Sequence, residues 1–213
     1  MSAVDTPEFS GPKGRFFAWF LTSPLRRVLE WRMGKPEERL MALLALEGHE
    51  EVLDAGCGSG FHTLMIAEKL TTGRVVGTDV SVEMLDRLGR LAAKQGLSDR
   101  IEPRLADNLA LDLPDASFDR ALSAAAWHHL ADTQQAGDEL ARVLRPGGRV
   151  VVVDLAIAPS EEAVPALGGH DRTFESADLE RIFATSGLTN VHVERVGRWL
   201  VGVATKPTQE DAS

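Results

Sequence analysis

The 213-residue sequence has little cysteine, no long apolar run and fewer basic than acidic residues. Cys57 is its single cysteine, so no internal disulfide can form and the fold needs no oxidising compartment. No stretch approaches the roughly 18 consecutive apolar residues of a membrane span, and the N-terminal residues lack the apolar core of a signal peptide. The net charge of -9 disfavours nucleic acid as a partner, because phosphate binding demands a basic surface. These absences predict a cytoplasmic protein that acts on a small molecule.

What the sequence does contain is an ordinary globular composition, with 44% hydrophobic and 26% charged residues. Its length suits one domain with a large core. The charge is unevenly spread, because residues 13–35 hold six basic residues against the single acid Glu30. This basic segment sits in an otherwise acidic chain and bears on the choice of partner.

Helical patterns at the start give way to an alternation of strands and helices. A helix is expected to start at Pro36, to bury Leu40, Met41, Leu43 and Leu44, and to stop at Gly48. Ser81 is expected to cap a later helix, and Asp132 with Gln135 another that "RPGG" ends. Alternating strands and helices predict an α/β fold with a parallel sheet covered on both faces. The expected strands are "EEVLDAG", "GRVVGTDV", "RIEPRLAD", "FDRALSAAA" and "RVVVVDLAI", and the stripe of the helix after Ser81 comprises Val82, Leu85, Leu88 and Ala92.

The C-terminal part has a different pattern. "SADLERIFATSGL" predicts a capped helix that buries Leu179, Ile182 and Phe183. "NVHVERVGRWLVGVAT" then predicts two strands joined by a tight turn, and strands joined in this way pair antiparallel.

The stretch "VLDAGCGSGFHTL" places Gly56, Gly58 and Gly60 in the first strand-to-helix turn. In open parallel sheets a ligand lies over this turn, and glycine permits both close approach and positive φ. A tight turn that binds nothing is the alternative. A dinucleotide fingerprint would need glycine where Phe61 stands, and a phosphate-binding Walker loop would need Gly-Lys-Ser/Thr where the chain has Gly-Phe-His. The loop therefore favours a cofactor with an adenosine but no phosphate to hold.

Two acids close successive strands beside this loop. Asp79 ends the second expected strand, where a carboxylate can accept hydrogen bonds from both ribose hydroxyls. Asp107 ends the third. An acid at a strand end can also be a helix cap or a solvated turn residue, but two acids beside a glycine loop favour adenosine.

These motifs together resemble the class I S-adenosylmethionine-dependent methyltransferases of the small-molecule type, such as the ubiquinone and menaquinone biosynthesis enzymes (methyltransferase type 11). The resemblance covers residues 50–155 through "VLDAGCGSG", "GTDVS", "ADNLALDLPDASFD", "AWHHLAD" and "ELARVLRPGGRVVVVD". It implies a Rossmann-like, doubly wound, mostly parallel seven-stranded sheet with a terminal antiparallel hairpin. It also implies S-adenosyl-L-methionine as cofactor and S-adenosyl-L-homocysteine as product.

Carried over by position, the resemblance implies a role for each cofactor-binding residue. Asp54, Gly56 and Gly58 would face the methionine end, with Gly60 in the same loop, and Asp79 would face the ribose. Val80 would face the adenine ring, Asp107 and Asn108 its edge, and Ala124 the amino group of the cofactor.

The resulting domain prediction has four parts. Residues 1–14 form a flexible arm, 15–48 an N-terminal helical cap, 49–206 the methyltransferase domain and 207–213 a disordered tail.

Methyl transfer is an in-line displacement at a sulfonium methyl group, so alignment and exclusion of water do most of the work. A general base is needed only when the acceptor must lose a proton. The candidates are His128 and His129, after the fourth strand, and His170, which precedes Asp171 in a later loop. Packing or structural hydrogen bonding is the alternative role for each. No metal is expected, because Asp107 and Asn108 are committed to adenine and no other acidic cluster has ligand spacing.

The segment "RFFAWF" holds four aromatic rings, those of Phe16, Phe17, Trp19 and Phe20, followed by Arg26 and Arg27. One interpretation is a helix that covers the cofactor site. The other is a peripheral contact with an anionic membrane, which would give access to a lipophilic acceptor such as a quinone precursor or a phospholipid.

The function predicted from the sequence is methyl transfer from S-adenosylmethionine to a small, apolar acceptor without a metal. The alternatives are a non-catalytic S-adenosylmethionine-binding module, a lipid or quinone methyltransferase at the membrane surface, and a nucleotide-binding oxidoreductase. A comparison of the affinities for S-adenosylmethionine and NAD tests the oxidoreductase hypothesis. Acceptor-dependent turnover distinguishes an enzyme from a non-catalytic binding module.

Overall fold

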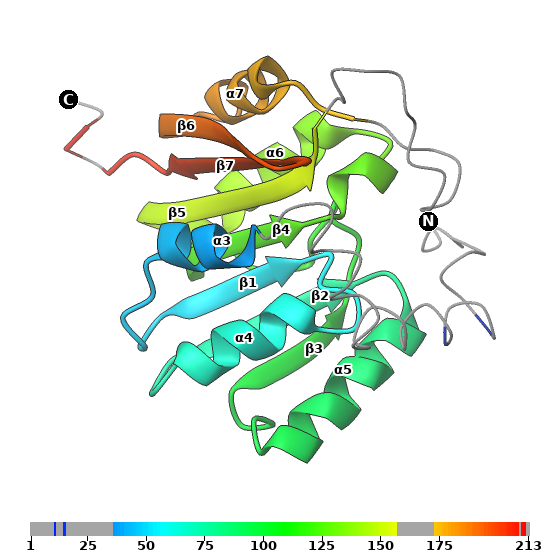
Figure 1. Cartoon of the computed structure of the whole chain (residues 1–213). Helices are drawn as coiled ribbons and strands as arrows, with labels where there is room; N and C mark the ends of the chain where they lie inside the picture. Colours follow the sequence, from blue (N-terminus) through cyan, green and yellow to red (C-terminus); the bar gives the residue numbers. More distant parts are fainter. Residues whose placement is uncertain (1–10, 12–14, 16–35, 157–172, 209, 212–213) are drawn as a thin grey trace.

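One mixed sheet organises the chain (Figure 1). The computed structural model describes residues 11, 15, 36–156, 173–208 and 210–211. Within them, seven strands lie in the order β3-β2-β1-β4-β5-β7-β6. The strands are β1 (Glu51–Ala55), β2 (Arg74–Asp79), β3 (Ile101–Leu105), β4 (Phe118–Ala124), β5 (Leu144–Leu155), β6 (Thr189–Val196) and β7 (Trp199–Thr205). The helices are α3 (Glu37–Leu44), α4 (Phe61–Lys69), α5 (Val82–Gln95), α6 (Thr133–Val143) and α7 (Ser176–Thr185), with a 3-10 turn η1 at Trp127–His129.

The strand directions confirm the predicted fold class. Strands β1 to β5 are mutually parallel, whereas β7 runs antiparallel to both β5 and β6. The tight β6–β7 turn contains Gly197 at φ 64°, a left-handed conformation that glycine adopts without strain. The chain therefore has the Rossmann-like sheet and the closing antiparallel hairpin that its sequence predicts.

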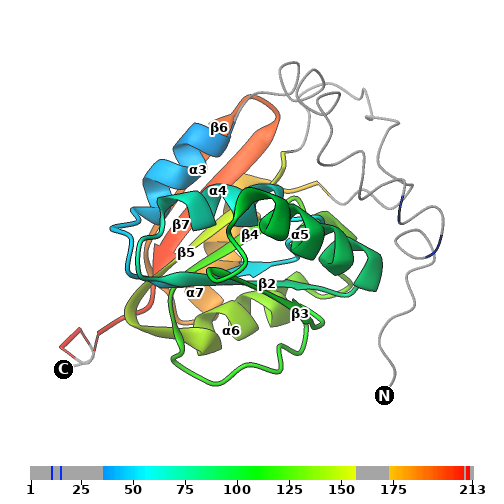
Figure 2. The ribbon, with the colours of Figure 1, turned by 90° about the horizontal axis from the view of Figure 1, so that it is seen from below.

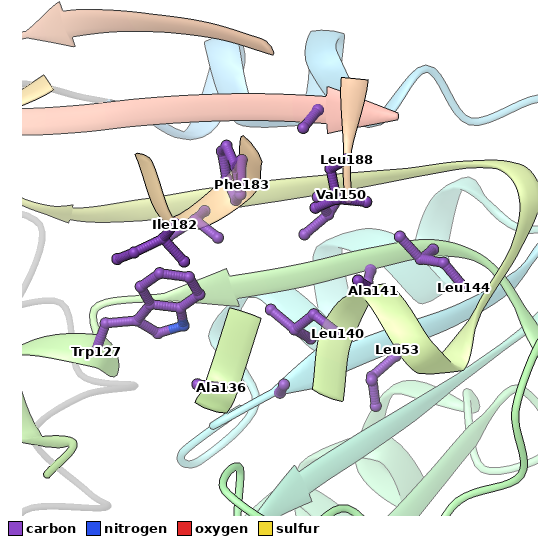
Figure 3. Packing of buried hydrophobic residues seen from close by; sticks show 14 of the residues in the cluster. Leu53, Trp127, Ala136, Leu140, Ala141, Leu144, Val150, Ile182, Phe183 and Leu188 are labelled. Carbon is purple, nitrogen blue, oxygen red and sulfur yellow. The ribbon is translucent and has the colours of Figure 1, made fainter. Parts of the chain in front are cut away.

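Helices cover both faces of the sheet, with α3, α4 and α5 on one side and α6 and α7 on the other (Figure 2). Each face has its own apolar core. Along β5, Val150 and Val152 enter the α6–α7 core, while Val151 and Val153 enter the core under α3, α4 and α5. This double burial explains why the strand reads as a continuous apolar run. Figure 3 shows the α6–α7 core, where Trp127, Ile182, Phe183 and Leu140 pack together.

Helix α3 is shorter than predicted. It ends at Leu44 rather than at Gly48, and Ala45 takes the left-handed conformation at φ 48°. Two guanidinium groups stop the helix, because Arg149 donates to the carbonyl oxygen of Leu43 and Arg120 to that of Leu44. These donors from β5 and β4 satisfy carbonyls that a longer helix would have used.

Two further expectations were wrong in detail. Val82, in the first turn of α5, leaves the predicted stripe with 55% of its surface exposed, and Met84 is buried instead. "RPGG" does not end α6. The helix stops at Val143, and Leu144 already pairs with Phe118 as the start of β5.

None of the described helices is both long and apolar enough to cross a membrane. Of the arm expected at residues 1–14, the structure describes Gly11, whose backbone N–H donates to Glu83 Oε1 at 2.7 Å. This bond places Gly11 against the first turn of α5.

Candidate active site

The carboxyl ends of the parallel strands bring the predicted site residues to one edge of the sheet (Figure 1). Asp54 lies near the end of β1, Asp79 ends β2 and Ala124 ends β4. Asp154 lies near the end of β5 at the same edge. Open parallel sheets bind ligands at this edge, outside the strand ends.

The glycine loop is built around positive φ angles and close packing. Gly56, Gly58 and Gly60 have φ of 76°, 53° and 89°, which L side chains rarely adopt. A Cβ on Gly56 would lie 2.7 Å from the Ala126 Cβ, and one on Gly60 would lie 2.3 Å from Leu88 Cδ1. At Gly56 and Gly60 the chain's own packing therefore demands glycine, apart from any ligand.

Asp54 is buried beneath this loop with 1% of its surface exposed, and its Oδ2 accepts a 2.6 Å hydrogen bond from Thr63 Oγ1. Burial raises the pKa of Asp54 from 3.8 to about 7, with a smaller lowering by the Thr63 hydroxyl and a smaller raising by the charge of Asp79. Burial at the same edge of the sheet is the main cause of a raised pKa of the Cys57 thiol. Because the thiolate is the reactive form, Cys57 is not a nucleophile.

The raised pKa of Asp54 predicts a pH-dependent stability. Between about pH 4 and pH 7 the folded protein keeps a proton on Asp54 that the unfolded chain has lost. The free energy of unfolding therefore falls as the pH rises through this window, by up to about 4 kcal/mol. Urea unfolding at several pH values should show the wild type losing stability relative to Asp54→Asn. Asp86→Asn, an exposed site on α5, is the matched control, and parallel curves for wild type and Asp54→Asn would contradict the prediction.

Asp79 is held by backbone donors on both sides. Its Oδ2 accepts from Gly58 N–H and its Oδ1 from Ser81 N–H, each at 2.9 Å. Burial raises the pKa of Asp79, and these two hydrogen bonds lower it by less. Each carboxylate oxygen accepts more than one hydrogen bond, so this anchored group can still accept from a ligand.

Several buried oxygens around the glycine loop lack a hydrogen-bond partner among the described residues. They are Ser59 Oγ in the loop, Thr78 Oγ1 beside Ala55 at the end of β1, and Asn108 Oδ1. Asn108 is 8% exposed, and its amide nitrogen lies 3.0 Å from the position of a Cβ on Gly56. Buried polar atoms are rarely left unpaired, so this cluster fits a polar ligand over the loop.

Asp107 closes a local turn, because its Oδ1 accepts from the backbone N–H of Leu109 at 2.9 Å. As at Asp79, such a bond still allows the carboxylate to accept from a ligand. Val80 and Ala124 are half-buried at the same edge, and Ala125 follows with a strained φ of 54°.

A buried pair, His128 and Asp154, occupies the end of β4 and β5. His128 Nδ1 lies 2.8 Å from Asp154 Oδ1, and the two side chains are 3% and 0% exposed. The other oxygen, Oδ2, accepts from the backbone N–H groups of Trp127 and His128, at 2.8 and 3.3 Å. A fourth donor is the N–H of Leu155, at 2.7 Å from Oδ1. The carboxylate accepts from three backbone N–H groups, and with Nδ1 as its fourth donor the lone pair of the His128 ring is on Nε2.

Sequence reasoning missed Asp154. The signal was present, because "VVVVD" ends a buried strand in an acid just as "VVGTD" does at Asp79. His129, the second candidate, lies against His128 with ring centroids 3.9 Å apart and ring planes tilted by 48°. His170, Asp171 and the aromatic residues Phe16, Phe17, Trp19 and Phe20 lie outside the described residues.

In the described part of the chain, no group of three or more His, Cys, Asp or Glu side chains could hold a metal ion. A shallow cavity of about 710 Å³ lies between α6, α7 and the C-terminal residues, lined by Arg142, Pro146 and Lys206 among others. Pro146 lies near the start of β5, so this cavity is at the opposite edge from the glycine loop.

Comparison with known proteins agrees with this geometry. Residues 52–148 match the model of the methyltransferase domain family. The chain is also 35% identical, over 157 residues, to demethylmenaquinone methyltransferase of Thermus thermophilus, with 68% of this chain and 70% of that protein covered. The chain belongs to the S-adenosylmethionine-dependent methyltransferase family. The family match spans this methyltransferase from β1 to Gly148, so it includes the glycine loop, Asp79 and His128 but stops before Asp154.

Other relatives match a smaller part of this methyltransferase or share a lower sequence identity with it. It is 34% identical over 139 residues to 27-O-demethylrifamycin SV methyltransferase of Amycolatopsis mediterranei, covering 65% of this chain and 51% of that protein. The chain thus spans about half the length of that relative. A solved methyltransferase from Aquifex aeolicus shares the fold, with a TM-score of 0.73 at 24% identity over 90% of this chain and 97% of that one.

Proposed function

We propose that the chain transfers the methyl group of S-adenosylmethionine to a small, apolar acceptor by in-line displacement, without a metal. The observation that carries the proposal is the meeting, at one sheet edge, of a cofactor-type glycine loop and the buried His128–Asp154 pair. A loop of this kind can hold a nucleoside, and the histidine can take a proton. Membership of the methyltransferase family supports the same conclusion.

The residues around the loop fit the cofactor. Asp54 and the glycine loop would hold the methionine end, and Asp79 the ribose hydroxyls. Asn108 Oδ1, which has no partner among the described residues, would accept from the adenine amino group, with Val80 against the ring. When bound, S-adenosylmethionine supplies a methyl group made electrophilic by the sulfonium.

His128 would act as the general base. The Asp154 carboxylate holds Nδ1–H, so the lone pair of Nε2 can accept the proton that an acceptor hydroxyl loses. The same carboxylate then stabilises the imidazolium that forms. Both side chains are buried, which excludes water and strengthens the interaction between them.

The test is turnover by the purified full chain. S-adenosylmethionine is incubated with a panel of small apolar acceptors, and S-adenosylhomocysteine is measured with and without each acceptor. Acceptor-dependent product is expected. Binding of S-adenosylmethionine by calorimetry, without product for any acceptor, would favour the non-catalytic module. Binding of NAD in place of S-adenosylmethionine would overturn the cofactor assignment.

Asp79→Ala should weaken S-adenosylmethionine binding by about 1–3 kcal/mol, roughly 5- to 150-fold in Kd, because two ribose hydroxyls lose their acceptor. Calorimetric titration measures the effect. Asp86→Ala, on the exposed surface of α5, changes the net charge equally and should leave Kd unchanged. Equal affinities for wild type and Asp79→Ala would remove Asp79 from the binding site.

A further inference from the structure

Trp199 is the first residue of β7 and stands at the functional edge of the sheet. It pairs with Leu155 in the antiparallel β5–β7 ladder, so it lies beside the carboxyl end of β5. Across the next ladder Ala124 pairs with Val153, two residues before Leu155. Side chains two residues apart point to the same face of a sheet, so Trp199 and Ala124 share a face and an edge.

Trp199 is close enough to Ala124 to contact a small molecule beside it. Strands β4 and β7 are separated only by β5, and two strand spacings amount to roughly 10 Å. The family resemblance would place Ala124 near the amino group of the cofactor. A small acceptor lying next to the methyl group would therefore extend over β5 toward the indole.

The indole nitrogen of Trp199 is unusual within the described part of the chain. Nε1 is shielded from solvent and has no hydrogen-bond partner there. A buried donor without a partner costs about 1–3 kcal/mol, and an apolar ring would pack here without that cost. Packing alone therefore explains the ring but not the N–H.

The surroundings of the indole are apolar. Its ring packs against the core under α3, α4 and α5 together with Val196 and Ala124, and Leu155 lies opposite in the ladder. A ligand here would meet an apolar wall with one hydrogen-bond donor. Pockets of this composition bind apolar molecules and use the few polar groups to orient them.

We propose that the indole N–H of Trp199 donates a hydrogen bond to an oxygen of the methyl acceptor and so orients it over the end of β5. This inference rests on the proposed function. The acceptor class that it names is an apolar, ring-sized molecule that carries a hydroxyl or carbonyl oxygen besides the atom that is methylated.

The test compares wild type with Trp199→Phe, which keeps an aromatic ring but removes the N–H together with the pyrrole part of the indole. The probes are 1,4-dihydroxynaphthalene and 1-naphthol, which differ by one oxygen, kept without air and in the presence of S-adenosylhomocysteine. The wild type should bind the diol roughly 10-fold more tightly than the mono-ol, and Trp199→Phe should lose this preference. The affinity for S-adenosylhomocysteine should not fall in the variant.

A direct readout is the indole signal in a nitrogen-15 spectrum, assigned by its disappearance in Trp199→Phe. The diol should move this signal downfield. Phe118→Leu is the matched control, because it alters a buried ring at the start of β4, the opposite edge, and should keep the preference for the diol.

Equal behaviour of wild type and Trp199→Phe toward both probes, with an unmoved indole signal, overturns the assignment. These measurements need no turnover. If Trp199→Phe loses the preference for the diol but the wild type methylates no acceptor, only the proposed function is contradicted. If turnover is the same in wild type and Trp199→Phe, only this inference is contradicted.

Discussion

Asp154→Asn is expected to lower kcat by about 10²-fold or more and to destabilise the fold. The carboxylate accepts from the backbone N–H groups of Trp127, His128 and Leu155 and from the His128 ring. An amide has one oxygen, and its NH₂ group would face donors. At least two buried donors then lose their acceptor, which costs roughly 2–6 kcal/mol in the free energy of unfolding.

The catalytic loss has a separate cause. If His128 is the base, as proposed, the variant has nothing to hold the hydrogen on Nδ1 or to stabilise the imidazolium, and base catalysis contributes about 10²–10⁴-fold. The pH profile of kcat should therefore change shape as well as height. The affinity for S-adenosylmethionine should stay within about twofold of wild type if the variant is folded, because Asp154 is not placed against the cofactor.

Further variants separate the effect of the His128–Asp154 contact on kcat from its effect on the stability of the fold. Asp138→Asn is the matched control, since that carboxylate accepts from Gln134 and Ser186 far from the edge, and its kcat should not change. His128→Ala should lose as much activity as Asp154→Asn, and the double variant should lose no more than either single one, because the two groups act as a unit. An unchanged kcat and pH profile in folded Asp154→Asn would remove the pair from catalysis.

Gly56→Ala is expected to cost about 3 kcal/mol or more of stability and to abolish binding of S-adenosylmethionine. Two effects add. A Cβ is strained at φ 76°, by about 1–2 kcal/mol, and it would stand 2.7 Å from the Ala126 Cβ and 3.0 Å from Asn108 Nδ2. Relief of the clash must move the loop after β4 or Asn108, and both belong to the proposed site.

Gly96→Ala separates the two effects. Gly96 has nearly the same φ, 70°, but a Cβ there would meet nothing within 4 Å, so its loss should be only about 1 kcal/mol. Adding Ala126→Gly to Gly56→Ala should recover part of the stability, because it removes the nearest clashing atom. Denaturant unfolding and calorimetry measure both quantities. Equal losses at Gly56 and Gly96 would show that the packing of the loop against Ala126 is unimportant.

The local features of the fold could be read from the residue pattern. The Ser81 cap, the Asp132 cap and the buried stripe of α7 depend on neighbours within a few residues, and the structure has all three. The exceptions show where distant groups intervene. Helix α3 ends early because Arg120 and Arg149 reach its carbonyls from strands more than seventy residues further along the chain.

The sequence by itself determined the alternation of strands and helices, the closing hairpin and the glycine loop after the first strand, since periodicity and turn chemistry are local properties of the chain. Only the tertiary structure decided which side chains meet. His128 and Asp154 are 26 residues apart, and they touch because β4 and β5 pair in parallel and end at one edge. Gly56 and Ala126 likewise meet across the β1–β4 ladder. Contacts of this kind depend on strand order and register, which no local pattern specifies, because the pairing free energy comes from burying both faces of the whole sheet at once.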